Sequence, residues 1–212
     1  MTAGALTYRP QLDGLRCVAI SFVLIEHFGG YLGTFVAGGY YGVDLFFVIS
    51  GYLITAILLK AQHPSFAASY RVFLGRRALR IFPAYYALLF LLLLLDFGPV
   101  RESFPWLATY TFNYPAALWE TEGRDNQLFY LWSLSVEEQF YLLWPPLVLA
   151  LRNRRNCLLG VTAAIIAVGY AQATHSIVHA LTPFNYTGLI NRMGSLGLGA
   201  SGAIYVSHRL LP

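Results

Sequence analysis

The stretch Leu15–Leu32, LRCVAISFVLIEHFGGYL, is almost wholly apolar or small, and it is long enough to cross a lipid bilayer as a helix. Within it, Arg16 and His27 are eleven residues apart. At about 100° and about 1.5 Å per residue, their side chains fall within about 20° of one helical face and about 16 Å apart. Ionisable groups inside a span are costly, so they face a bundle interior and mark a site. We therefore expect this helix to carry functional groups into a membrane domain.

The composition of the whole chain is that of a membrane protein. Hydrophobic residues make up 57% of the 212 residues and charged residues only 11%, about half the charged content of a soluble globular domain. The run Phe104–Leu118 is shorter than a span and contains two prolines, which suits a re-entrant or interfacial segment. We predict an all-α, polytopic transmembrane helix bundle in which residues 1–212 form a single domain. Its six predicted spans are Leu15–Leu32, Tyr40–Leu59, Ile81–Phe97, Leu128–Leu151, Cys157–Ala173 and Met193–Val206.

The placement of charge predicts the orientation of these spans. Residues 60–80 carry five basic and no acidic residues, and three arginines follow the fourth predicted span. Residues 96–126 carry five acidic residues against two arginines. By the positive-inside rule, the two basic loops are cytoplasmic and residues 96–126 lie outside. With six spans, both termini are then cytoplasmic.

Two adjacent glutamates stand about ten residues into the fourth predicted span. Glu137 lies about 15 Å deep from the outer side, and His27 reaches a similar depth from the cytoplasmic side, so the two could share one cavity. Glu26 lies beside the histidine. The alternatives are structural: an arginine that extends to the interface, a histidine bonded to a neighbouring helix, and an acid paired with a buried arginine.

The two glutamates are not equivalent on a helix. Glu137 shares its face with Ser133 and Tyr141, four residues before and after it, whereas Glu138 has leucines at both of those positions. We therefore favour Glu137 as the functional carboxylate.

Two further polar groups interrupt the apolar runs. The segment RRALRIFP, residues 76–83, stands at the cytoplasmic mouth of the third predicted span, and we expect its proline in the first helical turn. Arg77 and Arg80 share a face there and can bind phosphates, or they can anchor the helix to anionic lipid. In the second predicted span, Asp44 lies in the outer third. Ser50 and Gly51 form a small notch that serves close helix packing or the passage of a narrow ligand.

Taken together, these stretches resemble the acyltransferase 3 family of bacterial membrane O-acyltransferases. The resemblance rests on several motifs in the same order along most of the chain. They are RPQLDGLR at residues 9–16, Arg16 and His27 with ten residues between them, FFVISGY at 46–52, Arg77 with Arg80, WSLSVE at 132–137 with Phe140-Tyr141, and Asn191-Arg192 before a glycine-rich helix.

The resemblance implies transfer of an acyl group, usually acetyl, from cytoplasmic acyl-CoA to a hydroxyl of a cell-surface or exported glycan such as lipopolysaccharide. It implies a multi-pass protein of the bacterial inner membrane. Acyl-CoA is then a donor substrate, and we expect no bound cofactor, metal or nucleic acid. The candidate catalytic residues are His27, Glu137 and Glu26, the candidate acyl-CoA ligands are Arg16, Arg77 and Arg80, and the candidate acceptor or site-lining residues are Asp44, Ser50 and Tyr141.

Two routes for His27 stay open from the sequence. Its imidazole could act as the general base that a sugar hydroxyl needs near neutral pH, with Glu26 or Glu137 orienting the ring. Alternatively, it could accept the acyl group itself before passing it outward.

Family members usually have about ten spans of about 20 residues each, whereas six spans are predicted in this chain. We therefore expect this chain to be an N-terminal portion, a truncated product, or a subunit whose missing helices come from a partner chain. The alternative functions are an inactive remnant, a membrane scaffold, or half of a transporter, because transporters also place ionisable groups at midplane depth.

Overall fold

The structure is a computed structural model, and it describes residues 10–28, 31, 39–61, 65–121, 128–179 and 187–209. The side chains of residues 27, 28, 40, 119–121, 176–179, 208 and 209 lie outside this description. All the regular elements among the described residues are helices, as predicted. The six long helices are α1 (Pro10–Phe28), α2 (Gly39–Leu59), α3 (Phe66–Leu94), α6 (Trp132–Leu151), α7 (Arg155–His179) and α8 (Leu189–Arg209). The short elements are α4 (Val100–Ala108), α5 (Asn113–Thr121) and the 3-10 turn η2 (Phe129–Leu131).

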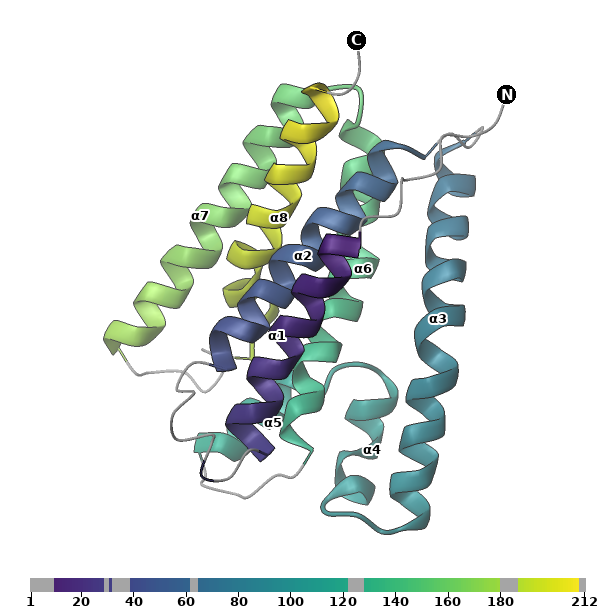
Figure 1. Ribbon diagram of the computed structural model, residues 1–212, viewed down its shortest axis with the longest axis vertical. Helices are drawn as coiled ribbons and strands as arrows, with labels where there is room; N and C mark the ends of the chain where they lie inside the picture. Colours follow the sequence, from purple (N-terminus) through teal and green to yellow (C-terminus); the bar gives the residue numbers. More distant parts are fainter. Residues whose placement is uncertain are drawn as a thin grey trace.

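The long helices run up and down in one bundle (Figure 1). α1 begins nearer the middle of the bundle, and the end of α8 lies at the same end as the turns from α2 to α3 and from α6 to α7. We call this the basic end, because it holds Lys60, Arg71, Arg152, Arg154 and Arg155. The opposite end, which holds α4 and α5, is called the distal end. The bundle therefore gathers the basic turns at one end, as the charge pattern predicts.

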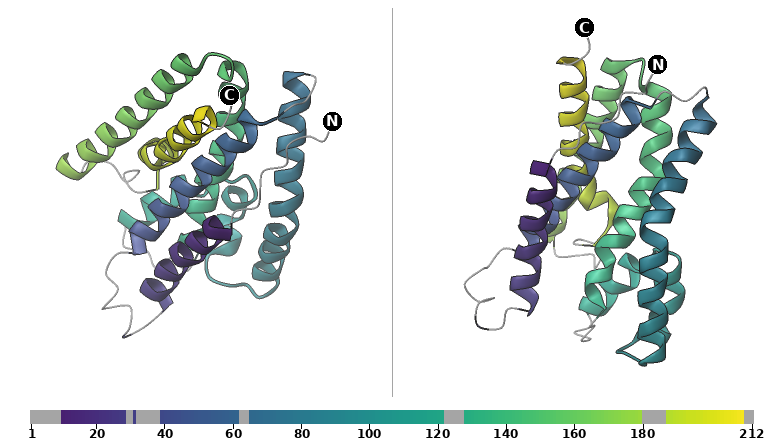
Figure 2. Two further views of the ribbon diagram at one scale, coloured as in Figure 1. Left: turned by 45° about the horizontal axis from the view of Figure 1, so that its top comes forward. Right: turned by 45° about the vertical axis from the view of Figure 1, so that its right-hand side comes forward.

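Three helices in the described part of the chain are long and apolar enough to cross a membrane. They are Tyr41–Leu59 in α2, Phe66–Leu94 in α3 and Arg155–His175 in α7. The remaining predicted spans correspond to the long helices α1, α6 and α8, which carry more polar residues. α3 stays at one edge of the bundle in both views of Figure 2, and only 11% of its most apolar window is buried. Its exposed apolar side chains suit contact with lipid.

The third helix differs from the predicted span Ile81–Phe97. It begins at Phe66, where the Ser65 hydroxyl accepts a hydrogen bond of 3.1 Å from the backbone N–H of Ala68. Such a cap satisfies one of the unpaired N–H groups of the first turn. The expected position of Pro83 in a first turn is therefore wrong, because this proline lies inside α3. The basic residues 71–80 are helical rather than part of a loop, since hydropathy detects only the apolar half of a helix that begins earlier.

The run Phe104–Leu118 does not form one long helix, in agreement with its expected failure to span. It contains the end of α4, a turn at residues 109–112 and the start of α5. In Figure 1 both short helices lie at the distal end. Tyr110 in the turn has a φ of 53°, a left-handed conformation that is strained for a residue with a side chain. This turn brings Tyr110 back toward α3 and α6.

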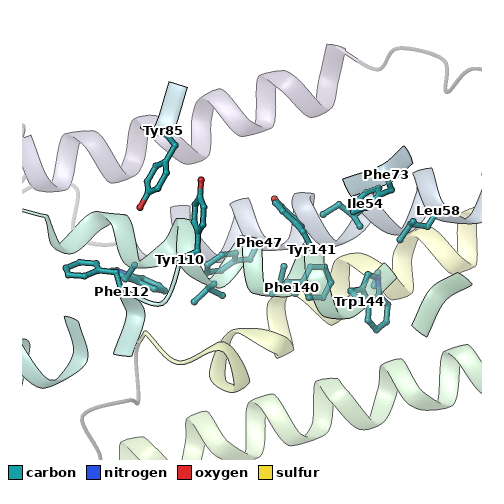
Figure 3. Packing of buried hydrophobic residues seen from close by; sticks show 14 of the residues in the cluster. Phe47, Ile54, Leu58, Phe73, Tyr85, Tyr110, Phe112, Phe140, Tyr141 and Trp144 are labelled. Atoms are coloured by element: carbon teal, nitrogen blue, oxygen red, sulfur yellow. The ribbon is translucent and has the colours of Figure 1, made fainter. Parts of the chain in front are cut away.

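The core lies where α2, α6 and α8 meet (Figure 3). Phe47 and Leu58 of α2 and Trp144 of α6 are almost completely buried there. Glycines let α2 and α8 approach closely. A Cβ at Gly51 would overlap the Leu196 carbonyl, and a Cβ at Gly199 would overlap the Val48 carbonyl. Such small residues allow backbone contact between helices in membranes.

The close contact between α2 and α8 predicts different effects on stability when two helical glycines are replaced with alanine. Gly51→Ala forces α2 away from α8 and should lower the free energy of unfolding by about 1–3 kcal/mol, the range for overpacking. Gly75→Ala in α3 is the matched control, because a Cβ there meets no atom within 4 Å. It should be neutral or stabilising, since alanine is the better helix former. Unfolding measured in detergent checks both, and equal stability of the two variants would contradict the close contact.

Candidate active site

A buried carboxylate lies at the centre of the site. Glu137, in the second turn of α6, is 3% exposed, and its Oε1 accepts a hydrogen bond of 2.5 Å from the fully buried Ser50 hydroxyl of α2. α2 and α6 both run from the distal end toward the basic end (Figure 1). These parallel neighbours place the two residues at one level. A buried charge is costly unless it is paired and hydrogen-bonded, so the groups around Glu137 determine what it can do.

Tyr141 and Arg77 extend this cluster toward α3. Tyr141 lies one turn after Glu137, is 1% exposed and is hydrogen-bonded to the carboxylate. The Arg77 Nη2 donates to the Tyr141 hydroxyl, and the guanidinium carbon lies 3.9 Å from the centre of that ring. This combination of a hydrogen bond and a cation–π contact holds α3 against α6 at the level of Glu137.

A second cation approaches Glu137 from α1. The positive charges of Arg16 and Arg77 both act on the Glu137 carboxylate. The Arg16 guanidinium lies 5.6 Å from the centre of the Phe46 ring of α2. The Nε atoms of both arginines are buried without a hydrogen-bond partner. The cluster of Arg16, Ser50, Arg77, Glu137 and Tyr141, which we call the central cluster, therefore has unused donors.

The central cluster unites five of the predicted site residues, and Arg80 lies apart from it. Arg80 follows Arg77 by three residues on α3 and is exposed. Its place on the lipid- or solvent-facing side of the edge helix leaves Arg77 as the arginine of this pair that enters the bundle.

Asp44 belongs to a different contact, nearer the distal end. Its Oδ1 accepts hydrogen bonds from the Arg192 Nη1 at 3.0 Å and from the Ser195 hydroxyl at 2.9 Å, both of α8. The Arg192 guanidinium also lies 5.4 Å from the centre of the Trp132 ring. Arg192 was not among the predicted site residues. The only signal for it in the sequence is the Asn191-Arg192 pair that precedes the glycine-rich helix.

Glu26 does not reach the central cluster. Its side chain packs against Gly39 at the start of α2. Ser50 lies eleven residues farther along α2, or about 16 Å along the helix axis. His27 follows Glu26 in the last turn of α1, and its side chain lies outside the described residues. A contact between His27 and Glu137 stays a prediction, and the α1 side chain whose charge acts on Glu137 is Arg16.

Comparison with known proteins connects this geometry to a family. A sequence model described as an acyltransferase domain matches residues 9–210, almost the whole chain. The chain belongs to the acyltransferase 3 family. No solved structure matches it.

Several bacterial relatives of this acyltransferase 3 chain are O-acetyltransferases by name. Peptidoglycan O-acetyltransferase OatA of Listeria monocytogenes is 34% identical over 154 residues, which cover 67% of this chain and 24% of the relative. YrhL of Bacillus subtilis, provisionally named a peptidoglycan O-acetyltransferase, is 37% identical over 150 residues, which cover 65% of this chain and 23% of the relative. The chain spans about a quarter of the length of these relatives. Their names indicate peptidoglycan rather than lipopolysaccharide.

The contact between Asp44 and Arg192 can be tested by a double-mutant cycle. In detergent, Asp44→Asn and Arg192→Gln should show a coupling free energy of about 1 kcal/mol, since the pair is partly exposed and partly screened. The Arg192 side chain is 10% exposed and that of Asp44 is 36% exposed. The control is the pair of Asp96 and Arg101, whose side chains are 67% and 69% exposed. Its coupling should be smaller, and a larger coupling there would contradict the importance of the α2–α8 pair.

Proposed function

We propose that this chain is the catalytic membrane part of an O-acetyltransferase. It takes an acetyl group from acetyl-CoA at the basic end and transfers it to a hydroxyl of a cell-surface glycan at the distal end. The observation that carries the proposal is the buried Glu137 carboxylate, approached by arginines from two different helices, in a member of the acyltransferase 3 family. The peptidoglycan relatives make a peptidoglycan sugar the first acceptor to test.

The charge distribution supports the position of the donor. Acyl-CoA carries phosphates and cannot dissolve in lipid, so its phosphates must be bound at an aqueous surface. α3 carries exposed arginines at positions 71, 76 and 80, and the half-buried Arg77 lies among them. The proposal assigns the phosphates to this exposed row and the thioester to the central cluster beside Arg77.

The reaction needs a base and a stabilised oxyanion. The acceptor hydroxyl loses its proton to a base, its oxygen forms a bond to the acyl carbon, the carbon–sulfur bond breaks, and the released CoA thiolate takes up a proton. Arg16 and Arg77 have the charge and the unused N–H groups to stabilise negative charge on the acyl oxygen. The other members of the central cluster, Ser50, Glu137 and Tyr141, hold the arginines in position.

His27 has a separate place in this proposal. It follows Arg16 by about three helical turns in the direction of the distal end, so its position on α1 is on the acceptor side of the central cluster. Both routes remain in the proposal: the imidazole as the base for the acceptor hydroxyl, or as the carrier of the acetyl group toward the distal end.

Kinetics on the chain in lipid nanodiscs, with acetyl-CoA and a β-1,4-linked N-acetylglucosamine tetramer, separate donor binding from chemistry. Replacing Arg77 and Arg80 together with glutamine should raise the KM for acetyl-CoA by about tenfold or more, because phosphate and thioester contacts are lost. His27→Ala should abolish turnover and leave acetyl-CoA binding nearly unchanged.

Arg101→Gln is the control for that experiment, because it removes an exposed arginine at the distal end. It should leave the KM for acetyl-CoA unchanged. If the Arg77/Arg80 and His27 variants instead lose folded protein equally and retain the kinetics of the original chain, these residues are structural. No acetyl transfer by the original chain would refute the activity of this polypeptide.

The proposed direction of transfer predicts the topology. In a background with Cys17→Ser and Cys157→Ser, we place single cysteines by Asn153→Cys at the basic end or Glu102→Cys at the distal end. Both sites are exposed in the structure. An impermeant thiol reagent on intact cells should label the cysteine at position 102 and reach position 153 only after the membrane is permeabilised. The reverse pattern would place the donor site outside and contradict the mechanism.

A further inference from the structure

A second carboxylate in α6 is not used by the central cluster. Glu138 follows Glu137, and its Oε1 is buried without a hydrogen-bond partner. The charge of Arg77 acts on both glutamates. The residues one turn away on the same helix are leucines, which makes the position look apolar in the sequence. The neighbours that make it polar come from α3 and from the turn at residues 109–112.

Tyr110 is the neighbour supplied by that turn. It is 7% exposed, and its hydroxyl is buried without a hydrogen-bond partner. Its ring is stacked on Tyr85 with ring centres 4.5 Å apart. Its backbone is held in the left-handed conformation by the Gln139 Nε2, which donates to the Tyr110 carbonyl at 2.9 Å. The phenol is therefore fixed in position rather than free to seek another partner.

The two unpaired groups interact electrostatically. The Glu138 carboxylate is near enough for its charge to act on the Tyr110 phenol. Burial raises the pKa of Tyr110, and this charge raises the pKa further, so the phenol keeps its proton and remains a donor. In Figure 3 the hydroxyls of Tyr110 and Tyr141 point to the same side of the buried cluster. A fixed donor and an unpaired acceptor thus stand next to the arginine of the central cluster.

We infer that Glu138 and Tyr110 form the subsite that binds the glycan acceptor. Glu138 accepts a hydrogen bond from one sugar hydroxyl, and Tyr110 donates a hydrogen bond to a second sugar oxygen. Arg77 contacts Tyr141 and its charge acts on Glu138, so it connects this subsite to the central cluster, where the proposed acetyl transfer takes place. The inference rests on the proposed function and names the residues that hold its acceptor.

The chemistry of the subsite favours a sugar over the donor. The carboxyl oxygens of Glu138 can accept hydrogen bonds from hydroxyl groups, and this side chain offers no positive charge to the phosphates of acyl-CoA. The turn at residues 109–112 also belongs to the distal end, opposite the exposed arginines. Buried polar groups without partners are uncommon in folded proteins, and a polar ligand is one reason to retain them. A structural water is the competing explanation, and it is an outcome of the test.

The test uses the full chain in nanodiscs and the β-1,4-linked N-acetylglucosamine tetramer as the probe. The tetramer at saturating concentration should raise the thermal midpoint of the original chain by about 2–4 °C. Glu138→Gln and Tyr110→Phe should each remove most of that shift. In the kinetic assay, each should raise the KM for the tetramer by about tenfold, the loss expected for one hydrogen bond, and leave the KM for acetyl-CoA within about twofold.

Tyr86→Phe is the matched control. It removes a hydroxyl from the same aromatic cluster, but this hydroxyl already donates to the Ala108 carbonyl at 2.9 Å. The variant should be less stable than the original chain and should keep the tetramer-induced shift. Tyr110→Phe keeps the ring and removes one oxygen atom, so it remains informative if Glu138→Gln fails to fold.

The outcomes separate this inference from the proposed function. Two results overturn the subsite: a tetramer-induced rise in thermal midpoint that is undiminished in Tyr110→Phe, or no such rise in the original chain. In either case, the Glu138 carboxyl and the Tyr110 hydroxyl bind a structural water instead. If the original chain transfers acetyl groups but the two variants keep its acceptor KM, only the subsite fails. If the tetramer binds through Glu138 and Tyr110 without any acetyl transfer, the subsite stands and the proposed activity of this chain fails.

Discussion

The burial of Glu137 is the constraint on which the rest of the structure depends. A carboxylate with 3% exposure in an apolar bundle must be paired and hydrogen-bonded, and no single helix can satisfy it. α2 provides the Ser50 hydroxyl, α1 provides the charge of Arg16, and α3 provides the charge of Arg77. Four helices are therefore held at one level by one group. Removing either arginine would leave the carboxylate with less compensation, which ties the electrostatics of the central cluster to the packing of the bundle.

The helices around this carboxylate are positioned by contacts away from it. Glycines at positions 51 and 199 bring α2 and α8 into backbone contact, and the pair of Asp44 and Arg192 joins the same two helices nearer the distal end. The Thr55 hydroxyl accepts a hydrogen bond of 2.8 Å from the Trp144 indole, which joins α2 to α6 toward the basic end. Ser50 lies between these contacts along α2. Its hydroxyl is thus directed at Glu137 by contacts on either side.

The polar groups of the bundle form a sequence along its axis that suits transfer from one side of a membrane to the other. Exposed arginines stand on α3, the central cluster lies inside the bundle at the level of Glu137, and the turn that carries Tyr110 approaches Glu138 from the distal end. An anionic donor and a hydroxyl-bearing acceptor need opposite environments, namely cations and an unpaired carboxylate. Arg77 contacts Tyr141 in the central cluster, and its charge acts on Glu138. Its contact with the Tyr141 ring keeps one guanidinium at the boundary between the two proposed half-sites.

Local pattern and tertiary contact contributed differently to this picture. The sequence by itself determined the long helices, the gathering of basic residues at one end and the failure of residues 104–118 to span, because hydropathy, proline and charge act over a few turns. It also predicted Arg16, Ser50, Arg77, Glu137 and Tyr141 as site residues, and the structure brings these five together in the central cluster. It misplaced the start of α3, since a charged helical segment has no hydropathy signal. Only the tertiary structure decided that Arg192 meets Asp44 and that the charge of Glu138 acts on Tyr110. Those partners are 148 and 28 residues apart in the chain, and a pattern within one helix contains no information about which distant side chain will face it.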